Sequence, residues 1–248
     1  MSFDRLAPHY RWMEWLLAGR KLQRCRTTFL DALPPVQHAL LLGEGNGRFL
    51  RELLLKEPGA RVTCVDASKQ MLSEARRRAR ADERVRFVCC DVMAWTPRRD
   101  QFDLVVSNFF LDCFRADQIE AIVQKIRTVL TDDARWLIAD FSEPHRGWRK
   151  WRARTILRAM YWFFRRATKL PAKDLTAPDT ILARYGFELR ARRTFEWGLL
   201  QSDLWARRWV EARVVENDLG RWRTRLRHQF SLTVRARGLG YLAPEISG

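Results

Sequence analysis

Three glycines, Gly43, Gly45 and Gly47, stand at alternate positions directly after the apolar run 40–42. Glycine is needed where the backbone takes a positive φ or where a ligand must approach without a Cβ in the way. An amphipathic segment follows at once, so the glycine turn would open a helix whose free N–H groups favour electron-rich ligand atoms. On its own the pattern is a weak signal, because chance turns also contain it.

Two acidic residues make the glycine turn informative. Asp66 and Asp91 end the next two strand-like segments. Ligands of a doubly wound sheet lie outside the carboxyl ends of its strands, so both carboxylates should meet the turn. Asp66 suits the hydroxyls of a ribose and Asp91 an adenine amino group. The alternatives are a helix-cap partner or surface acid for Asp66, and a surface acid for Asp91. The set predicts a nucleoside-binding α/β domain.

The periodicity of apolar residues predicts the elements that would position these groups. Short β-rich runs alternate with helical segments of about 10–15 residues, which indicates βαβ units and a parallel sheet. Strands are expected at 38–42, 61–66, 85–90, 102–107 and 134–141, and helices at 47–56, 68–80, 116–130 and 176–185. Two final strands, 187–194 and 198–205, should pair antiparallel. Residues 3–33 should form one or two helices that either cover the ligand mouth or pack on the sheet edge.

Composition narrows the class of protein. The 248 residues suffice to bury about 70–75% of the unfolded surface. No apolar run reaches the roughly 18 residues of a membrane span, and the first residues lack the apolar core of a signal peptide. The five cysteines form no CxxC pair, so we expect reduced thiols in the cytoplasm, with no metal site and no disulfide framework. Motifs of zinc proteases, serine hydrolases and P-loop enzymes are missing from the sequence.

The net charge of +17 is unevenly distributed. Residues 1–145 carry 23 basic and 20 acidic side chains, a net +3, whereas residues 146–248 carry 23 and 9, a net +14. Such an excess indicates an anionic partner, which would be a membrane surface, a nucleic acid or an acidic substrate, or else a solvated face.

Residues 146–170 carry nine of these basic side chains, six aromatic ones and no acidic one. One helical stripe is formed by Ala153, Leu157, Met160, Tyr161 and Phe164. The segment therefore reads as a basic amphipathic helix, which either touches an anionic membrane or packs over the sheet as a lid.

Five segments of the chain resemble the class I S-adenosylmethionine-dependent methyltransferases, and the resemblance covers roughly residues 38–204. They read LLLGEGNGRFL, VTCVDASKQML, VRFVCCDVMAW, FDLVVSNFFLDCF and RWLIADF. The opening FDRLAPHY resembles the N-terminus of the small-molecule methyltransferases related to ubiquinone and menaquinone biosynthesis. The resemblance implies a Rossmann-like, doubly wound sheet of seven strands in the order 3-2-1-4-5-7-6, with the last strand antiparallel and helices on both faces. It divides the chain into a helical cap (1–36), a methyltransferase domain (37–205) with the inserted lid 146–170, and a basic extension (206–248).

The resemblance also implies the residues that bind S-adenosylmethionine and its product S-adenosylhomocysteine. The glycines would line the methionine part, Asp66 would take the ribose hydroxyls and Asp91 the adenine amino group. Asn108 would face the transferred methyl. The full set is Gly43, Glu44, Gly45, Gly47, Asp66, Ala67, Met71, Asp91, Val92, Met93 and Asn108. The chain has Leu41 where the family usually has an acidic residue, and Glu44 would take over its contact with the methionine amino group.

Methyl transfer requires an aligned nucleophile and, for some acceptors, a base. Asp112, beside Asn108 and the aromatic pair 109–110, is the first candidate base and His9 the second. A helix cap or loop hydrogen bond is the alternative for Asp112, and a structural role for His9. We therefore expect a methyltransferase for a small lipophilic or aromatic acceptor. An RNA or DNA methyltransferase and a scaffold without catalysis are the alternatives, and a dehydrogenase is a distant fourth.

Overall fold

The computed structural model describes residues 19–97, 101–144, 146–168 and 176–208, and for 160–168 the backbone alone. The chain divides into two compact units at Arg208, and every described residue belongs to the first, Met1–Arg208. Residues 1–18 of the predicted cap, which include His9, and residues 209–248 of the predicted extension 206–248 lie outside the described residues.

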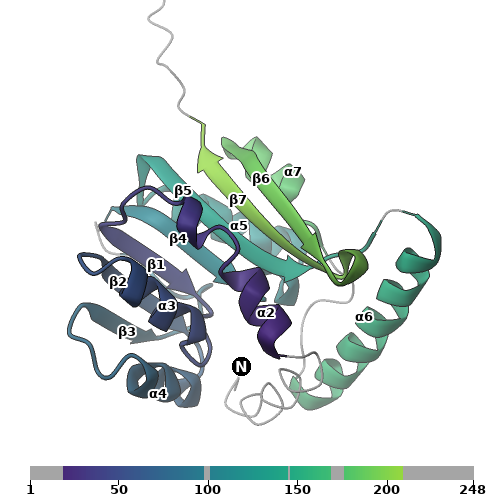
Figure 1. Ribbon diagram of the computed structural model, residues 1–248, viewed down its shortest axis with the longest axis horizontal. Helices are drawn as coiled ribbons and strands as arrows, with labels where there is room; N and C mark the ends of the chain where they lie inside the picture. The colour runs from purple at the N-terminus through teal and green to yellow at the C-terminus, as the bar shows by residue number, and fades with distance from the viewer. Residues whose placement is uncertain (1–18, 98–100, 145, 169–175, 209–248) are drawn as a thin grey trace, which may run out of the picture. The chain divides into compact units, whose positions relative to one another are not determined.

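A seven-stranded sheet in the order β3-β2-β1-β4-β5-β7-β6 forms the centre of the unit (Figure 1). Its strands are β1 (His38–Leu42), β2 (Arg61–Asp66), β3 (Val85–Cys89), β4 (Phe102–Asn108), β5 (Leu130–Phe141), β6 (Phe187–Phe195) and β7 (Leu200–Arg207). The first five strands pair in parallel, and β7 pairs antiparallel with both β5 and β6. The strand order and the final antiparallel pair confirm the prediction.

Helices connect the strands and cover both faces of the sheet. They are α2 (Gly19–Arg26), α3 (Arg48–Lys56), α4 (Lys69–Arg78), α5 (Ala116–Arg127), α6 (Gly147–Thr168) and α7 (Asp179–Arg184), with short 3₁₀ turns η2 (Leu30–Ala32), η3 (Leu111–Cys113) and η4 (Glu196–Gly198). In Figure 1, α2 and α3 lie in front of the strands, α5 lies behind them, and α4 lies next to β3 at the edge of the sheet.

Alternation along the buried strands creates two cores. Leu40, Leu42 and Val105 point toward the face covered by α5, whereas Leu41 and Val106 point toward the face covered by α3 and α4. Each helix presents its apolar stripe to one of these faces; in α5 the stripe is Ile119, Ile122, Val123 and Ile126. Because both faces are covered, the central strands read as continuous apolar runs.

Several boundaries differ from the sequence prediction by one to four residues, and three of these differences have a visible cause. The expected helix 116–130 ends at Arg127, and β5 begins at Leu130 because that residue pairs with Phe102 at the edge of β4. The turn at 196–198 delays β7 to Leu200. The expected helix 176–185 is shorter, because Pro178 stands at its N-cap.

Candidate functional site

The glycine turn joins β1 to α3 with three left-handed residues. Gly43, Gly45 and Gly47 have φ of 62°, 66° and 80°, a conformation that disfavours residues with a Cβ. The Gly43 N–H donates to the Val65 carbonyl at 2.9 Å, which ties the turn to β2. The three glycines differ in their surroundings. A Cβ at position 45 would meet no heavy atom within 4 Å, whereas one at position 47 would lie 2.6 Å from Ala75 of α4.

The Asp66 carboxylate lies against the turn. One oxygen accepts the Gly45 N–H at 3.0 Å and the other accepts the Ser68 N–H at 2.8 Å. Ser68 in turn caps α4, because its hydroxyl accepts the Met71 N–H at 3.2 Å. The carboxylate therefore fixes the turn after β1 and the start of α4 to each other.

A cavity opens at the carboxyl ends of β1 to β4, where the strand order reverses between β1 and β4. It encloses about 740 Å³ of space between the atoms, part of which is open solvent at its mouth. One wall comes from the glycine turn and the strand ends: Gly43, Gly45, Val65, Asp66, Ala67, Ser68, Met71, Cys90, Asp91 and Val92.

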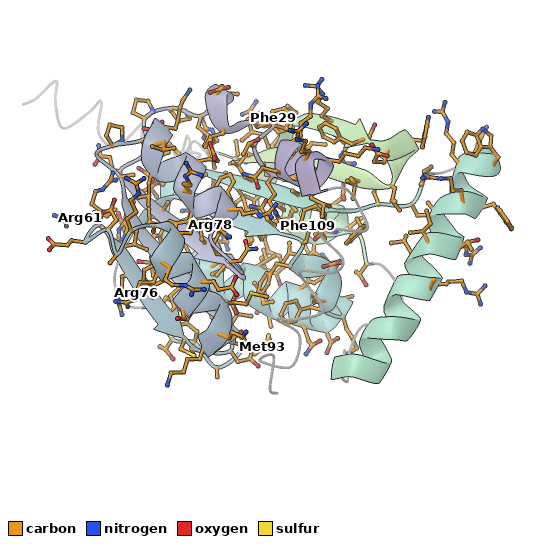
Figure 2. All side chains as sticks on the ribbon, turned by 60° about the horizontal axis from the view of Figure 1, so that its bottom comes forward. Phe29, Arg61, Arg76, Arg78, Met93 and Phe109 are labelled. Carbon is orange, nitrogen blue, oxygen red and sulfur yellow. The ribbon has the colours of Figure 1, made fainter. Side chains whose placement is uncertain are left out.

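The opposite wall is aromatic and follows β4. It consists of Phe109, Phe110, Cys113 and Phe114. Phe109 has a φ of 53°, its ring centroid lies 5.3 Å from that of Phe141, and the Arg26 guanidinium of α2 stacks 5.2 Å from it. Figure 2 shows Phe109 at the ends of the strands beside α2. Phe110 and Phe114 meet edge to face at 5.0 Å.

Several residues of the predicted cofactor set lie elsewhere. Gly47 packs against α4, and Met93, which is 37% exposed, lies well apart from Phe109 (Figure 2). The Asp91 carboxylate lines the cavity but also accepts the Met93 N–H at 2.9 Å. Gly43, Gly45, Asp66, Ala67, Met71, Asp91 and Val92 are the members of the predicted set that line the cavity.

Glu44 serves the start of α3 instead of lining the cavity. Its carboxylate accepts the Leu50 N–H at 2.9 Å. Burial raises the pKa of Glu44 to about 7, a shift that the N–H groups of Leu50 and Phe49 and the charge of Arg26 oppose. The role predicted for Glu44 at the methionine amino group therefore competes with this helix cap.

Asn108 and Asp112 are both buried, and neither lines the cavity. Both amide atoms of Asn108, at the end of β4, have no hydrogen-bond partner among the described residues. A buried amide without partners destabilises the fold. The donor and acceptor atoms of Asn108 therefore remain available for a hydrogen bond next to the aromatic wall.

Asp112 forms a pair with Asp140 at the end of β5, and the sequence analysis did not single out Asp140. The Asp112 N–H donates to Asp140 Oδ2 at 3.2 Å, and the two carboxyl groups also hydrogen-bond to each other. Burial raises the pKa of Asp112 to about 6 and that of Asp140 well above its usual range. The sequence feature that could have identified Asp140 is its place as an acidic residue near the end of an apolar strand, in the run 136–141.

The residues that line the cavity fit a nucleoside cofactor. A positive-φ glycine leaves open space at position 45, a carboxylate stands beside it, and apolar side chains of Val65, Met71 and Val92 offer faces to a purine. The sheet order, the glycine turn and these acidic strand ends together define a class I methyltransferase architecture.

Comparisons with known proteins agree with that class. Residues 39–133 match the family model described as "Methyltransferase domain". The chain is 32% identical over 146 residues to the ubiquinone/menaquinone biosynthesis C-methyltransferase UbiE of Paracoccus denitrificans, covering 57% of this chain and 58% of that protein. It is 35% identical over 130 residues to the malonyl-(acyl-carrier protein) O-methyltransferase of Enterobacter lignolyticus, covering 52% of this chain and 47% of that protein. The matches thus span about half the length of these relatives.

Solved structures share the fold at low sequence identity. The mitomycin 7-O-methyltransferase MmcR has a TM-score of 0.59 and 18% identity, with 84% of this chain and 61% of that chain covered. The 1,6-didemethyltoxoflavin-N1-methyltransferase of Burkholderia thailandensis, solved with S-adenosylhomocysteine, has a TM-score of 0.53 and 21% identity, with 76% and 77% covered. The matched domain and the shared fold make this chain similar to the class I S-adenosylmethionine-dependent methyltransferases.

Proposed function

We propose that this chain transfers a methyl group from S-adenosylmethionine to a small lipophilic or aromatic acceptor. The observation that carries the proposal is a single cavity with two different walls. One wall has the glycine turn and the carboxylates of Asp66 and Asp91, and the other has three phenylalanines. The polar wall suits a nucleoside, and the aromatic wall suits an apolar ring or chain.

The protein's part in such a reaction is binding, alignment and exclusion of water. When bound, S-adenosylmethionine supplies the methyl group on its sulfonium. Asp66 would hold the ribose, while Phe109 and Phe110 would hold the acceptor and keep water from the reacting atoms. The relatives named for ubiquinone and menaquinone biosynthesis support an acceptor that is at least partly lipophilic.

The geometry supports a positioning role for Asp112. Asp112 is buried and does not line the cavity, and its carboxyl group pairs with that of Asp140. Phe110 and Cys113, close to it in the chain, do line the cavity. The acid pair thereby fixes the 3₁₀ turn that carries the aromatic wall. We propose no step in which the Asp112 carboxylate touches the acceptor.

Asp66→Ala is expected to weaken binding of S-adenosylhomocysteine by about 5- to 150-fold, because a partly buried hydrogen-bond acceptor contributes about 1–3 kcal/mol. Isothermal titration calorimetry measures the change. The matched control is Asp103→Ala, because Asp103 also accepts two backbone N–H groups, from Gln37 at 2.7 Å and His38 at 3.1 Å. These contacts lie at the amino ends of the strands, so this variant should lose stability and keep its affinity. Wild-type affinity in Asp66→Ala would remove the carboxylate from the cofactor site.

Incubation with radiolabelled S-adenosylmethionine tests the acceptor class. Label is expected in the organic phase when the protein is given a total lipid and quinone extract, and not in total RNA given separately. Phe110→Ala should lower this transfer, because it removes part of the aromatic wall while leaving the carboxylates in place. Label found only in RNA would support instead a nucleic-acid methyltransferase that uses the basic part of the chain.

A further inference from the structure

Three tryptophans stand exposed at one place on the first unit. Trp148 and Trp151 belong to the first turns of α6, and Trp197 belongs to η4; their exposed fractions are 61%, 74% and 55%. The Trp148 and Trp197 ring centroids lie 6.2 Å apart. Soluble proteins seldom expose indole rings in a group unless the group contacts something else. We call these three residues the tryptophan cluster.

The cluster is built by two segments of chain that other contacts hold together. The Arg152 guanidinium stacks 4.7 Å from the Trp197 ring and donates to the Glu196 carbonyl at 3.5 Å. The Ser142 hydroxyl donates to the Gly198 carbonyl at 2.6 Å, and the turn thus joins the segment that leads into α6. Figure 1 shows η4 beside the first turns of α6.

The backbone of η4 has an unfavourable conformation at the residue that carries the exposed indole ring. Glu196 and Trp197 have φ of 51° and 58°, and Gly198 follows at 92°. Bulky residues seldom adopt a positive φ, and such conformations persist only where the surrounding structure enforces them. The strained turn is therefore consistent with a use for the exposed ring.

The other face of α6 is already occupied. Ala153 and Leu157, two members of the stripe predicted from the sequence, are buried against Phe141, Leu199 and Leu200. At 100° per residue, Trp148 and Trp151 fall on the side of the helix opposite these two residues. The side chains of Met160, Tyr161 and Phe164 lie outside the described residues. The described residues of the stripe pack inward. The tryptophans therefore lie on the outward face of α6.

Positive charge surrounds the tryptophan cluster. The side chain of Arg146, just before α6, and those of Arg149, Arg154 and Arg158 along its described turns are exposed. Acidic side chains nearby, Glu143 and Glu196, have cationic partners in Lys150 and Lys21 at 3.7 Å and 2.7 Å. Indole rings with flanking arginines are the composition of segments that lie in the headgroup region of an anionic bilayer.

We propose that the tryptophan cluster and its flanking arginines dock this protein on the surface of an anionic membrane. The indole rings enter the headgroup region, and the arginines face lipid phosphates. Trp148 and Trp151 stand on the convex outer face of a helix, which suits a flat lipid surface better than the grooves that guide single-stranded nucleic acid. In the described part of the chain, no helix has the length and hydropathy needed to cross a bilayer, so the contact is peripheral.

Co-sedimentation of the full chain with vesicles tests the proposal. We expect binding to phosphatidylcholine vesicles that contain phosphatidylglycerol and little binding to pure phosphatidylcholine. Replacing Trp148 and Trp151 together by alanine should lower the partition coefficient by about tenfold or more. Replacing Arg149 and Arg154 together by glutamine should lower it by about fivefold for each arginine, with the loss greatest at low salt.

Two controls separate the cluster from the general charge of the protein. Arg51→Gln combined with Arg77→Gln removes the same charge from exposed positions of α3 and α4 and should leave vesicle binding within about twofold of wild type. Leu55→Ala removes an exposed apolar side chain, 69% accessible, from α3 and should also bind normally. Tryptophan emission should shift to the blue on binding.

Three outcomes would overturn the proposal: undiminished vesicle binding by the Trp148 and Trp151 double variant, equal losses in the Arg51 and Arg77 control, or no binding to anionic vesicles at low salt. Preferential binding of a single-stranded RNA that displaces the vesicles would assign the cluster to nucleic acid instead. Unchanged circular dichroism and an unchanged affinity for S-adenosylhomocysteine verify that each variant is folded. These readouts require no methyl transfer, so the result is independent of the proposed function.

Discussion

Gly43→Ala is expected to weaken binding of S-adenosylhomocysteine by more than about 100-fold, a loss of roughly 3 kcal/mol. A Cβ at this position would overlap the ring of Phe110, whose Cε2 atom would lie only 2.7 Å away. The backbone φ of 62° adds strain for any residue with a side chain. Because the Phe110 ring already lines the cavity, a displaced ring would enter the space in which the cofactor is expected to bind.

Gly45→Ala separates the effect of backbone strain from the effect of overlap with the Phe110 ring. Its φ is 66°, nearly the same as at position 43, but a Cβ there would meet no heavy atom within 4 Å. Backbone strain alone should destabilise this variant by about 1–2 kcal/mol with a smaller loss of affinity. Calorimetric titration measures affinity, and urea unfolding measures stability.

The double variant Gly43→Ala with Phe110→Ala tests the overlap directly. Removing the ring should recover most of the affinity lost in Gly43→Ala, apart from the strain measured in Gly45→Ala. Phe110→Ala alone provides the reference for the double-variant cycle. If Gly43→Ala binds as tightly as the wild type, the glycine turn does not cradle the cofactor.

The sequence was sufficient to predict the strands of the sheet and the residues that form the polar wall of the cavity. Both follow from local patterns, because a strand, a glycine turn and a helix each leave a signature in consecutive residues. Asp66 and Asp91 were found because the first ends a strand and the second follows one closely, and parallel strands bring their carboxyl ends to one edge. The strand order itself came from the resemblance to a family and not from periodicity.

The rest of the site depends on contacts between distant segments. Asp140 meets Asp112 across 28 positions of sequence, and no local pattern identifies such a pair. Glu44 stands inside the glycine turn, yet its carboxylate turns toward the start of α3. Which face a side chain takes in an irregular turn depends on three-dimensional packing. The same limit applies to Trp197, whose exposure results from a strained turn that the sequence analysis placed between two strands.

Asp112→Asn is expected to stabilise the protein at pH 8 by about 1–3 kcal/mol while leaving its stability at pH 4 nearly unchanged. In the wild type, burial raises the pKa of Asp112 from its usual 3.8 to about 6 and also raises that of Asp140. Between pH 3.8 and about pH 6, the folded protein therefore retains a proton on Asp112 that the unfolded chain has released. The stability of the wild type therefore falls as the pH rises from about 4 through 6, by about 3 kcal/mol for a shift of two pKa units.

The amide introduced by Asp112→Asn would remove one of these titrating groups. It can donate permanently to the Asp140 carboxyl group, while its oxygen keeps the contact with the Cys113 thiol, 3.5 Å from Asp112 Oδ1 in the wild type. The other ionisable groups nearby, the Cys25 and Cys113 thiols, stay protonated because burial raises their pKa values. Urea unfolding at pH 4, 6 and 8 should therefore show a flatter profile for the variant.

Two further variants make this expectation specific to the pair. Asp140 accepts the Asp112 and Phe141 N–H groups with separate oxygens, so Asp140→Asn loses one acceptor and should gain little. Asp203 holds Arg192 through two contacts of 2.8 Å, so Asp203→Asn should destabilise the protein at neutral pH.

The same Asp112→Asn variant separates positioning from catalysis. A base that touches the acceptor contributes about 100- to 10,000-fold to kcat, whereas a residue that positions the aromatic wall should mainly alter KM for the acceptor. We expect kcat within about tenfold of the wild type, because Asp112 is buried and is not among the residues that line the cavity. Asp112 would be established as the base if the variant lost more than about 100-fold in kcat while its cofactor affinity stayed intact. The increase of kcat with rising pH would then also be absent from the variant. A steeper loss of stability at pH 8 in the variant would instead show that the two carboxyl groups do not share the buried site as the hydrogen bonds indicate.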